Sequence, residues 1–437
     1  MAQESVRERR PDAPAEGGRR RPGPRSRRPA ASRPPFDLRR HRRLAPLVVP
    51  VVAFTWAACS RAWMQEDGFI NLRIVQQLLA GHGPVYNTGE RVEAYTSPLW
   101  IFVLAVLRVV TLALVPLEWL AVIAGIGLAV AGTVLVLVGS VALWTPPGRR
   151  AGAVWWLPVG ALVPVVLAAS WEFASSGLET GLSVAWLGAA FAGVAVAARR
   201  SEGRGRVRWI GLAVLIGLGP LVRPEITLYS VGFALAAWFA AVRPAREAGR
   251  TDVPSTPRLV AALLGVPVAY QLFRMGYFAT LVPTTALAKN ASTIEAGRGV
   301  TYLTNFLTPY HLIVPLLIVV ILVAVDRPFR RRSTQIVAAG IVIPAVANVG
   351  YVIAIGGDYM HGRFWLVPLT ALLAPVAALP LPRRRAQQAP RLAALGLVAA
   401  WALLCAGLWR PTPIQGEIQD QRAIDIKYFH EAPVRVG

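Results

Sequence analysis

The chain has 437 residues, 55% of them hydrophobic, and a mean hydropathy of +0.48. Its apolar runs of about 17–25 residues match the length a helix needs to cross a bilayer and differ from the short alternating strands of a membrane β-barrel. The net charge of +23 does not indicate nucleic-acid binding, because arginines gather in the N-terminal tail and in short loops without interleaved aromatic residues. We therefore expect an all-α polytopic membrane protein that binds the lipid bilayer and no nucleic acid.

Residues 1–43 precede the first apolar run and contain fourteen arginines. The segment is rich in Arg, Pro, Gly and Ala and has almost no large apolar residues, a composition typical of disorder. Positive charge beside a first span favours the cytoplasmic side. We predict a disordered, basic cytoplasmic tail and a first span that stays in the membrane as an anchor, because no clear cleavage site follows it.

The apolar runs predict about eleven membrane crossings within one transmembrane domain, residues 44–409. A further run, 98–115, is interrupted by Arg108 and is expected to be a juxtamembrane or re-entrant element, since the arginine-rich loops then all lie inside. Segment 410–437 follows as an extracytoplasmic tail of a multi-pass plasma-membrane protein. The predicted spans are 44–63, 117–143, 151–169, 181–198, 209–222, 226–242, 259–275, 308–325, 334–355, 364–382 and 392–409.

This topology places every connection that is poor in arginine on the outer face, where their polar residues can converge. The first of them, 64–97, begins with an adjacent carboxylate pair, Glu66 and Asp67. Acidic residues are costly beside a bilayer, so the pair indicates a functional site. We predict that Asp67 is a general base toward a sugar hydroxyl and that Glu66 tunes its pKa. A solvated charged loop, or capping of a helix that begins near Gly68, would explain the same residues.

Arginine side chains bind phosphate in bidentate fashion, and arginines of the outer connections are candidates for this role. Arg73 follows the acidic pair, and Arg223 stands with Glu225 between two apolar runs. We predict that these three residues, with Lys289 of a later connection, bind the phosphate and sugar of a donor. A snorkelling arginine paired with Glu225 would explain Arg223 equally well, and a plain surface lysine would explain Lys289.

The sequence GGDYMHGRF, residues 356–364, brings Asp358, His361 and Arg363 together between two apolar runs. Its glycines are typical of a tight turn where backbone approaches a ligand, and we predict that the three side chains bind the donor's sugar or phosphate. A purely structural turn is the alternative. One Asp and one His are too few for a metal site, so none is predicted and no cofactor is required, although a divalent metal could assist.

Other polar residues of the outer connections are predicted to bind an acceptor. The segment SWEFASSGLETG contributes Glu179 and is typical of a loop lining a polar cleft, although helix capping by Ser or Thr would look similar. Walker, dinucleotide-binding, GxSxG and HExxH motifs are absent from the sequence, which favours a lipid-linked substrate over a soluble nucleotide. The acceptor candidates of the first outer loop are His82, Glu90, Arg91 and Glu93.

The stretch EDGFINLRIVQQLLAGHGPVYNTGERVEAYTSPLW resembles the first outer loop of GT-C membrane glycosyltransferases. With SSGLETGL, LVRPE, TLVPTTALAKN and GGDYMHGRF in that order, residues 60–430 are similar to the actinobacterial terminal β-(1→2)-arabinofuranosyltransferases. The resemblance implies a GT-C bundle with juxtamembrane helices on the outer face and Asp67 as the essential acid. It also implies a decaprenyl-phosphate-arabinofuranose donor and an acceptor that is the arabinan of arabinogalactan or lipoarabinomannan.

The family usually carries a carbohydrate-binding domain after its last span, and DQRAIDIKYFHEAPVRVG looks like its opening. Asp67 could also act as a nucleophile if the linkage retains the donor's configuration. Two rival functions stay open: transfer from a polyprenyl-phosphomannose, and a lipid-linked-sugar flippase or small-solute transporter. A transporter predicts essential charges near the bilayer midplane, whereas an enzyme predicts them clustered at one surface.

Overall fold

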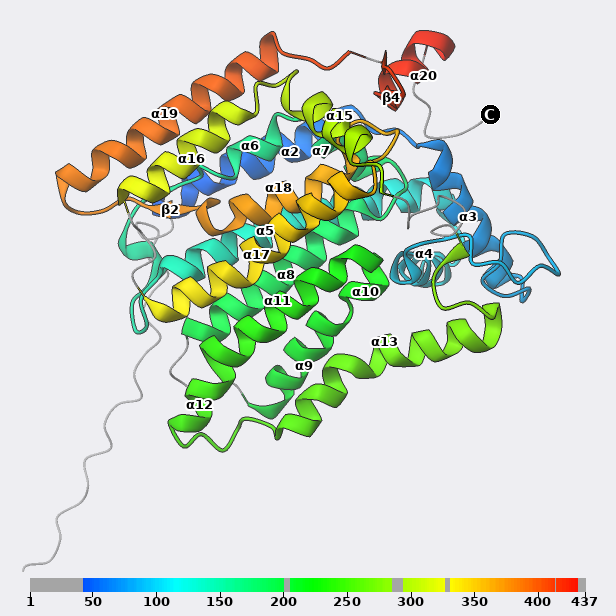
Figure 1. Cartoon of the computed structure of the whole chain (residues 1–437), viewed down its shortest axis with the longest axis horizontal. Coiled ribbons are helices and arrows are strands. Elements are labelled where there is room, and N and C mark those ends of the chain that lie inside the picture. Colours follow the sequence, from blue (N-terminus) through cyan, green and yellow to red (C-terminus); the bar gives the residue numbers. More distant parts are fainter. Residues whose placement is uncertain (1–41, 200–204, 285–293, 327–330, 413, 431–437) are drawn as a thin grey trace, which may run out of the picture. The chain divides into compact units, whose positions relative to one another are not determined.

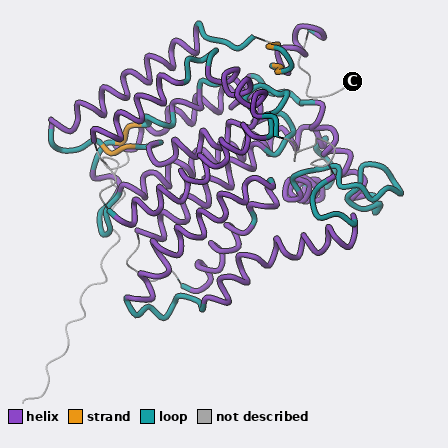
Figure 2. The backbone as a smooth tube through the Cα atoms, in the orientation of Figure 1, coloured by secondary structure: helices purple, strands orange, loops and turns teal. Residues whose placement is uncertain are grey.

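The computed structural model describes residues 42–199, 205–284, 294–326, 331–412 and 414–430, all of which belong to one structural unit, Arg39–Gly437. The predicted disordered tail lies outside the described residues except for its last two. Helices dominate, with two short pairs of strands (Figure 2). Because seven of the described helices are long and apolar enough to cross a membrane, the prediction of an all-α polytopic membrane protein is confirmed.

The seven helical spans follow the apolar runs of the sequence, and Figure 1 shows most of them packed side by side. Two of them are composite: a 3₁₀ turn, Arg42–Leu47, leads into α2, and a π-helical turn, Trp238–Val242, joins α11 to α12. The bounds of the helices in these spans are Val48–Ser60 (α2), Leu117–Trp144 (α5), Thr180–Arg199 (α8), Thr227–Ala237 (α11), Arg243–Glu247 (α12), Thr256–Phe278 (α13), Arg332–Ala354 (α17) and Arg385–Gly407 (α19).

Shorter elements connect the spans. The helices are Glu66–Leu79 (α3), Pro98–Val110 (α4), Leu162–Val165 (α6), Ala168–Ser175 (α7), Arg206–Gly217 (α9), Gly219–Val222 (α10), Ala296–Leu307 (α15), Ile313–Asp326 (α16), Leu366–Leu373 (α18) and Gln421–Phe429 (α20). Short 3₁₀ turns cover Ala151–Ala153, Pro224–Ile226, Arg363–Trp365 and Ala374–Val376. The strands are Trp156–Leu157 (β1) and Leu379–Pro380 (β2), then Ile414–Gln415 (β3) and Ile418–Gln419 (β4), each pair antiparallel.

Two predicted spans are wrong as single helices. Segments 151–169 and 364–382 each consist of short helical pieces and a short strand, since proline removes a donor from a helix and glycine weakens it. The two segments hydrogen-bond to each other: Gly160 N–H donates to the Val376 carbonyl at 3.0 Å, and β1 pairs with β2. Irregular backbone inside a membrane protein is tolerated where protein groups satisfy it in this way. The number of crossings stays a prediction.

The centre of the helical unit is the pair α5 and α8, which lie against each other in Figure 1. Glycines at the contact let the two backbones approach closely. A Cβ on Gly132 would lie 2.6 Å from the nitrogen of Ala185, and one on Gly181 would lie 2.2 Å from the carbonyl oxygen of Gly125. Small residues drive helix packing in membranes, where apolar side chains gain little by leaving lipid. This contact fixes the position of the loop that precedes α8.

Four segments far apart in the sequence meet at the end of the unit where α8 begins. They are the start of α3, the loop before α8, the break between α10 and α11, and the turn after α17. The predicted re-entrant element 98–115 is α4, a 13-residue helix shorter than a bilayer crossing requires, and it packs against α3.

Candidate functional site

The first part of the site is the N-terminus of α3, which carries Asp67. The side-chain oxygen of Gln65 accepts a hydrogen bond from the Asp67 N–H at 2.6 Å and so caps the helix. The Gln65 N–H donates to the carbonyl of Ser176 at 3.1 Å, and Gly68 permits the close approach, because a Cβ there would lie 2.7 Å from the same carbonyl. Asp67 is therefore held half-buried against the loop before α8, whereas Glu66 is exposed.

Tyr359, which the sequence analysis did not single out, connects Asp67 to the turn after α17. Its hydroxyl donates to Oδ2 of Asp67 at 3.4 Å and accepts from Nε2 of Gln65 at 3.4 Å. Gln65 thus contacts both the backbone of Asp67 and the group that touches its carboxylate. Burial, followed by the negative charge of Asp67, raises the pKa of the Tyr359 hydroxyl, which therefore stays a proton donor at neutral pH.

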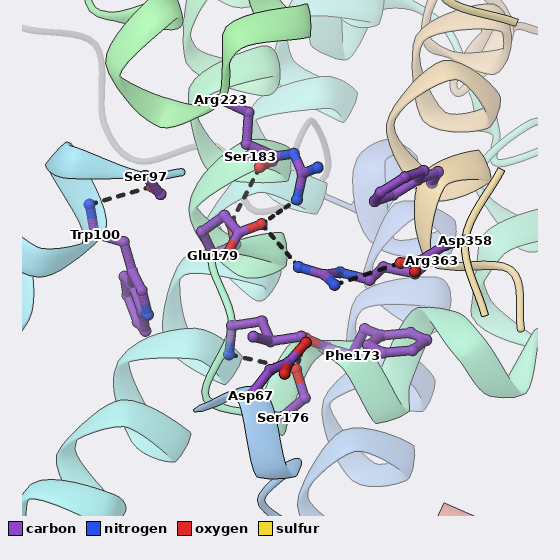
Figure 3. A network of polar contacts seen from close by, with 12 residues as sticks. Asp67, Ser97, Trp100, Phe173, Ser176, Glu179, Ser183, Arg223, Asp358 and Arg363 are labelled. Atoms are coloured by element: carbon purple, nitrogen blue, oxygen red, sulfur yellow. Dashed lines mark hydrogen bonds and ion pairs between the residues drawn. The ribbon is translucent and has the colours of Figure 1, made fainter. Parts of the chain in front are cut away.

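The second part of the site is a network of two arginines and three carboxylates, and Figure 3 shows both arginines with Glu179 and Asp358. Arg363 donates from Nη2 to Oε1 of Glu179 at 3.3 Å and from Nη1 to Oδ2 of Asp358 at 3.4 Å. Arg223 is paired with the same oxygen of Glu179 and with Glu225. Glu179 therefore bridges two guanidinium groups that come from segments 140 residues apart (363 − 223).

Glu179 is ionised within this network. Burial alone would raise the pKa of its carboxyl, but the positive charges of Arg223 and Arg363 outweigh burial and lower the pKa to about 2. A buried carboxylate of this kind is stable only because both cations are present. Glu179 was predicted to bind an acceptor, and the structure groups it instead with the arginines predicted to bind phosphate.

A small cavity of about 20 Å³, enough for a water-sized group, opens between these charged groups and the last turn of α17. Both arginines face the ring of Phe364, with guanidinium-to-centroid distances of 4.9 Å for Arg223 and 5.6 Å for Arg363. The Nε–H of Arg363 is buried and has no acceptor among the described residues. An unpaired buried donor is costly, so this cavity offers a place for a ligand oxygen.

The turn Gly356–Arg363 follows α17 and supplies Tyr359 and Arg363 to the site. Gly356, Gly357 and Gly362 all have positive φ values of 73–81°, which side chains disfavour, as the prediction of a tight turn requires. The close approach is to protein rather than to a ligand, because a Cβ on Gly357 would lie 2.3 Å from the ring of Tyr302.

His361 of this turn is buried, with its ring beside those of Phe306 and Tyr310. Its Nδ1 lies 2.6 Å from the side-chain oxygen of Asn305, whose amide nitrogen donates to Gln415, so Nδ1 carries the proton. Burial lowers the pKa of His361 to about 4, and the imidazole is neutral at physiological pH. The contacts of His361 tie the turn to the C-terminal segment instead of placing it among the donor-binding candidates.

The C-terminal segment docks on the same turn. The Gln419 N–H donates to the Tyr359 carbonyl at 2.7 Å, and the His361 N–H donates to the Gln419 carbonyl at 2.8 Å. Met360 lies between them and is fully buried. The end of the chain that was expected to begin a separate domain therefore supports the backbone of a candidate site residue, which no sequence motif indicated.

Other predicted site residues lie apart from this network. Arg73 is exposed and donates from Nε to the Tyr86 carbonyl at 2.9 Å, so it holds its own loop instead of joining the two arginines. The acceptor candidates His82, Glu90 and Arg91 are also exposed. Nδ1 of His82 lies 2.7 Å from Oε1 of Gln77, and the carboxylate of Glu90 accepts from the amide of Asn87 at 3.1 Å. The guanidinium group of Arg91 lies over the ring of Tyr277. Lys289 lies outside the described residues.

Glu93, the remaining acceptor candidate, is a structural anchor. It is fully buried and accepts hydrogen bonds from Arg274 at 2.7 and 3.2 Å and from the hydroxyl of Tyr270 at 2.7 Å. Both partners belong to α13, so Glu93 fastens the first outer loop to that helix. With its oxygens occupied by these donors, it offers little to a substrate.

A second carboxylate with a perturbed pKa, Glu172, lies in α7 near the C-terminal segment. Burial and the negative charge of Asp420 raise the pKa of its carboxyl to about 8, although Arg422 and two other arginines oppose the shift. The folded state therefore holds a proton that the unfolded chain releases near the usual pKa of 4.5. This stabilising contribution is complete below that value and is lost as the pH rises through 8.

We expect Glu172→Gln to remove most of this pH dependence, because the amide mimics the protonated acid. The melting temperature of the purified wild type should fall as the pH rises from 5 to 9. The melting temperature of the variant should fall less over the same range. The exposed Glu417 serves as the control, since Glu417→Gln should leave the slope unchanged. Equal slopes in wild type and Glu172→Gln would contradict a raised pKa at this position.

Comparison with known proteins supports the resemblance that the sequence suggested. The chain is 39% identical over 354 residues to a terminal β-(1→2)-arabinofuranosyltransferase of Mycobacterium tuberculosis, covering 76% of this chain and 54% of the relative. A protein of the same name from Corynebacterium glutamicum is 35% identical over 371 residues, covering 77% of this chain and 51% of the relative. The chain is a homologue of these arabinofuranosyltransferases.

The predicted resemblance to terminal β-(1→2)-arabinofuranosyltransferases is thus confirmed. The match spans about half the length of these curated relatives. No protein-family model matches the chain. Among the described residues, no group of three or more His, Cys, Asp or Glu side chains could hold a metal ion.

Proposed function

We propose that the chain is a GT-C-type glycosyltransferase that moves arabinofuranose from decaprenyl-phosphate-arabinose to the non-reducing ends of cell-wall arabinan on the outer face of the membrane. The observation that carries the proposal is the meeting of Asp67, from α3, with Tyr359 in the turn that also supplies Arg363. A carboxylate with one hydroxyl donor lies beside a buried guanidinium network. The names of the relatives indicate that the transferred sugar is arabinofuranose. The site thus combines a candidate base with candidate phosphate ligands.

The proposed reaction needs one base and one stabilised leaving group. Asp67 takes the proton of an acceptor hydroxyl while the hydroxyl oxygen bonds to the anomeric carbon of the donor. The bond from that carbon to the phosphate oxygen breaks at the same time. The polyprenyl phosphate leaves with the electron pair of that bond. Hydrogen bonds from Arg363 and Arg223 stabilise the charge on the departing phosphate.

The arginine network can bind a phosphate only through donors that its carboxylates leave free. Two guanidinium groups face three carboxylates, so the network has no surplus positive charge before substrate arrives. The free Nε–H of Arg363 supplies one donor without any rearrangement. We propose that this donor contacts the phosphate first and that Glu179 keeps both guanidinium groups oriented.

The position of the charges supports an enzyme over a transporter. Glu179 directly precedes α8, Arg223 directly follows α10, and Asp67 is in the first turn of α3. These are ends of helices and lie at one end of the central helix pair. A transporter would place such charges in the middle of its spans, at discontinuous helices reached from both sides in turn.

The decisive experiment supplies membranes that contain the protein with a labelled polyprenyl-phosphoarabinose and a short arabinan acceptor. We expect label to enter the acceptor from this donor and not from polyprenyl-phosphomannose. Transfer from the mannose lipid alone would establish the rival mannosyltransferase. Movement of the donor across vesicles without transfer would establish a flippase.

Tyr359→Phe tests how the hydroxyl acts on the proposed base. Removing a hydroxyl that donates to the Asp67 carboxylate removes a contact that orients the proposed base, so the rate of transfer should fall. We expect transfer at pH 7 to fall about 10-fold, in proportion to one lost hydrogen bond to a charged group. Tyr86→Phe is the control, because Tyr86 contacts Arg73 through its ring and carbonyl. A wild-type rate in Tyr359→Phe, or an equal loss in Tyr86→Phe, would contradict a role for the Tyr359 hydroxyl in positioning the base.

A further inference from the structure

A second charged cavity lies at the opposite end of the helical unit from the candidate site. Four arginines from the loops after α5 and after β2 line a cavity of about 360 Å³ together with Trp144 at the end of α5 and Trp156 of β1: Arg149, Arg150, Arg383 and Arg384. We call it the four-arginine pocket. Glu179 and Arg199 bracket α8, and Arg199 bonds to the pocket wall, so one helix of 20 residues, about 30 Å long, separates the pocket from the site.

The backbone of the pocket is held by neighbouring elements. Leu381 N–H donates to the Trp155 carbonyl at 2.7 Å, which continues the β1–β2 pairing across the two loops. Arg43 donates to the Ala153 carbonyl at 2.6 Å, and Arg199 donates to the Arg149 carbonyl at 2.5 Å. Hydrogen bonds from neighbouring elements therefore hold the backbone on both sides of the cavity.

The charges of the pocket are not neutralised within the described part of the chain. Each of the four arginines is exposed, and none has a carboxylate within ion-pair distance there. Three other arginines at loop ends are paired: Arg243 with Glu247, Arg250 with Asp252, and Arg391 with Asp326. Cytoplasmic arginines that only set topology need no cavity and no shared wall. Four arginines without a carboxylate partner around one cavity make it a favourable site for an anion.

We propose that the four-arginine pocket binds the phosphate headgroup of an anionic phospholipid in the leaflet opposite the candidate site. The lipid source is favoured by position, since the pocket lies where α5 and α8 end and the exposed ring of Trp155 stands beside it. Tryptophan is enriched at this level of a bilayer, and basic pockets at span ends bind anionic headgroups. Guanidinium forks match phosphate oxygens in bidentate fashion.

The test measures binding of phosphatidylglycerol, cardiolipin and phosphatidylcholine to the full chain in detergent by native mass spectrometry. We expect the anionic lipids to bind and phosphatidylcholine not to compete with them. The double variant Arg150→Gln/Arg384→Gln should bind the anionic lipids at least 10-fold more weakly. The matched control, Arg206→Gln/Arg208→Gln, removes the same charge from exposed positions at the start of α9, outside the pocket lining, and should bind as the wild type does.

Equal weakening in both double variants would overturn the proposal, because binding would then follow net charge alone. A photoreactive phosphatidylglycerol gives a second measurement on the unaltered protein, and its cross-links should map to residues 144–156 and 380–384. Cross-links elsewhere would also overturn the pocket assignment. Displacement of the lipid by millimolar inorganic phosphate would mean that the ligand is a soluble anion, contrary to the proposal.

Discussion

Membranes that carry Asp67→Asn should lose sugar transfer by about 100-fold or more, which is the usual range for removing a general base. The amide keeps the size of the side chain but cannot take a proton from an acceptor hydroxyl. The fold should persist, because the cap that starts α3 uses the Asp67 N–H and the side chain of Gln65, and neither changes. The measurement is initial rate with saturating donor and acceptor, together with the melting temperature of the purified variant.

Glu66→Gln is the matched control for this experiment. It removes the same charge one residue earlier, but Glu66 is exposed and has no hydrogen-bond partner among the described residues. We expect it to keep most of the wild-type rate. Equal activity in Asp67→Asn and wild type would show that Asp67 is not the base. Loss of activity in Glu66→Gln alone would assign the role of the base to Glu66.

The meeting of the distant polar segments was predictable from the sequence because it depends on the direction of each span. The arginine-rich loops were predicted to lie on the cytoplasmic side of the membrane. The segments that contain Asp67, Glu179, Arg223 and Arg363 were then left on the outer side. The structure places these segments at one end of α8. Which side chains touch depends on helix ends and turn geometry, and loop charge carries no information about either.

Arg73 illustrates what helix geometry could have excluded. It lies six residues after Asp67 in α3, and at about 100° per residue the two side chains point in directions about 120° apart, some 9 Å along the axis. A residue so placed cannot share a pocket with the start of its own helix. Glu179 was assigned to the acceptor for the opposite reason, since its partners are 44 and 184 residues away and no local pattern reveals them.

Tyr359 and Gln65 were missed because their types have commoner explanations. Tyrosine is expected at membrane interfaces, and glutamine is not among the preferred capping residues. Segment 151–169 was wrongly predicted as one continuous helix for a different reason. High hydropathy indicates that a segment is buried but does not show that it is helical. Pro158, Gly160 and Pro164 were visible signs that its buried backbone would be irregular.

Glu179→Gln should destabilise the protein by about 3–5 kcal/mol, the usual cost of breaking a buried ion pair from one side. The change leaves Arg363 with Asp358 and Arg223 with Glu225, but removes the charge that lies between the two guanidinium groups. Since the charges of both arginines hold the pKa of Glu179 near 2, lowering the pH to 5 should not reduce the difference. The measurement is denaturant or thermal unfolding of purified protein at pH 5 and pH 7.

Glu225→Gln is the matched control, because its side chain is 17% exposed against 4% for Glu179 and it contacts one arginine instead of two. It should cost clearly less than Glu179→Gln. The double variant Glu179→Gln/Arg363→Gln should recover part of the stability, since it removes one of the two buried charges left without their shared partner. If Glu179→Gln were no more destabilising than Glu225→Gln, or if removing Arg363 made it worse, the bridge between the two arginines would not be what holds the outer segments together. The convergence of Asp67, Arg223 and Arg363 would then need another physical cause.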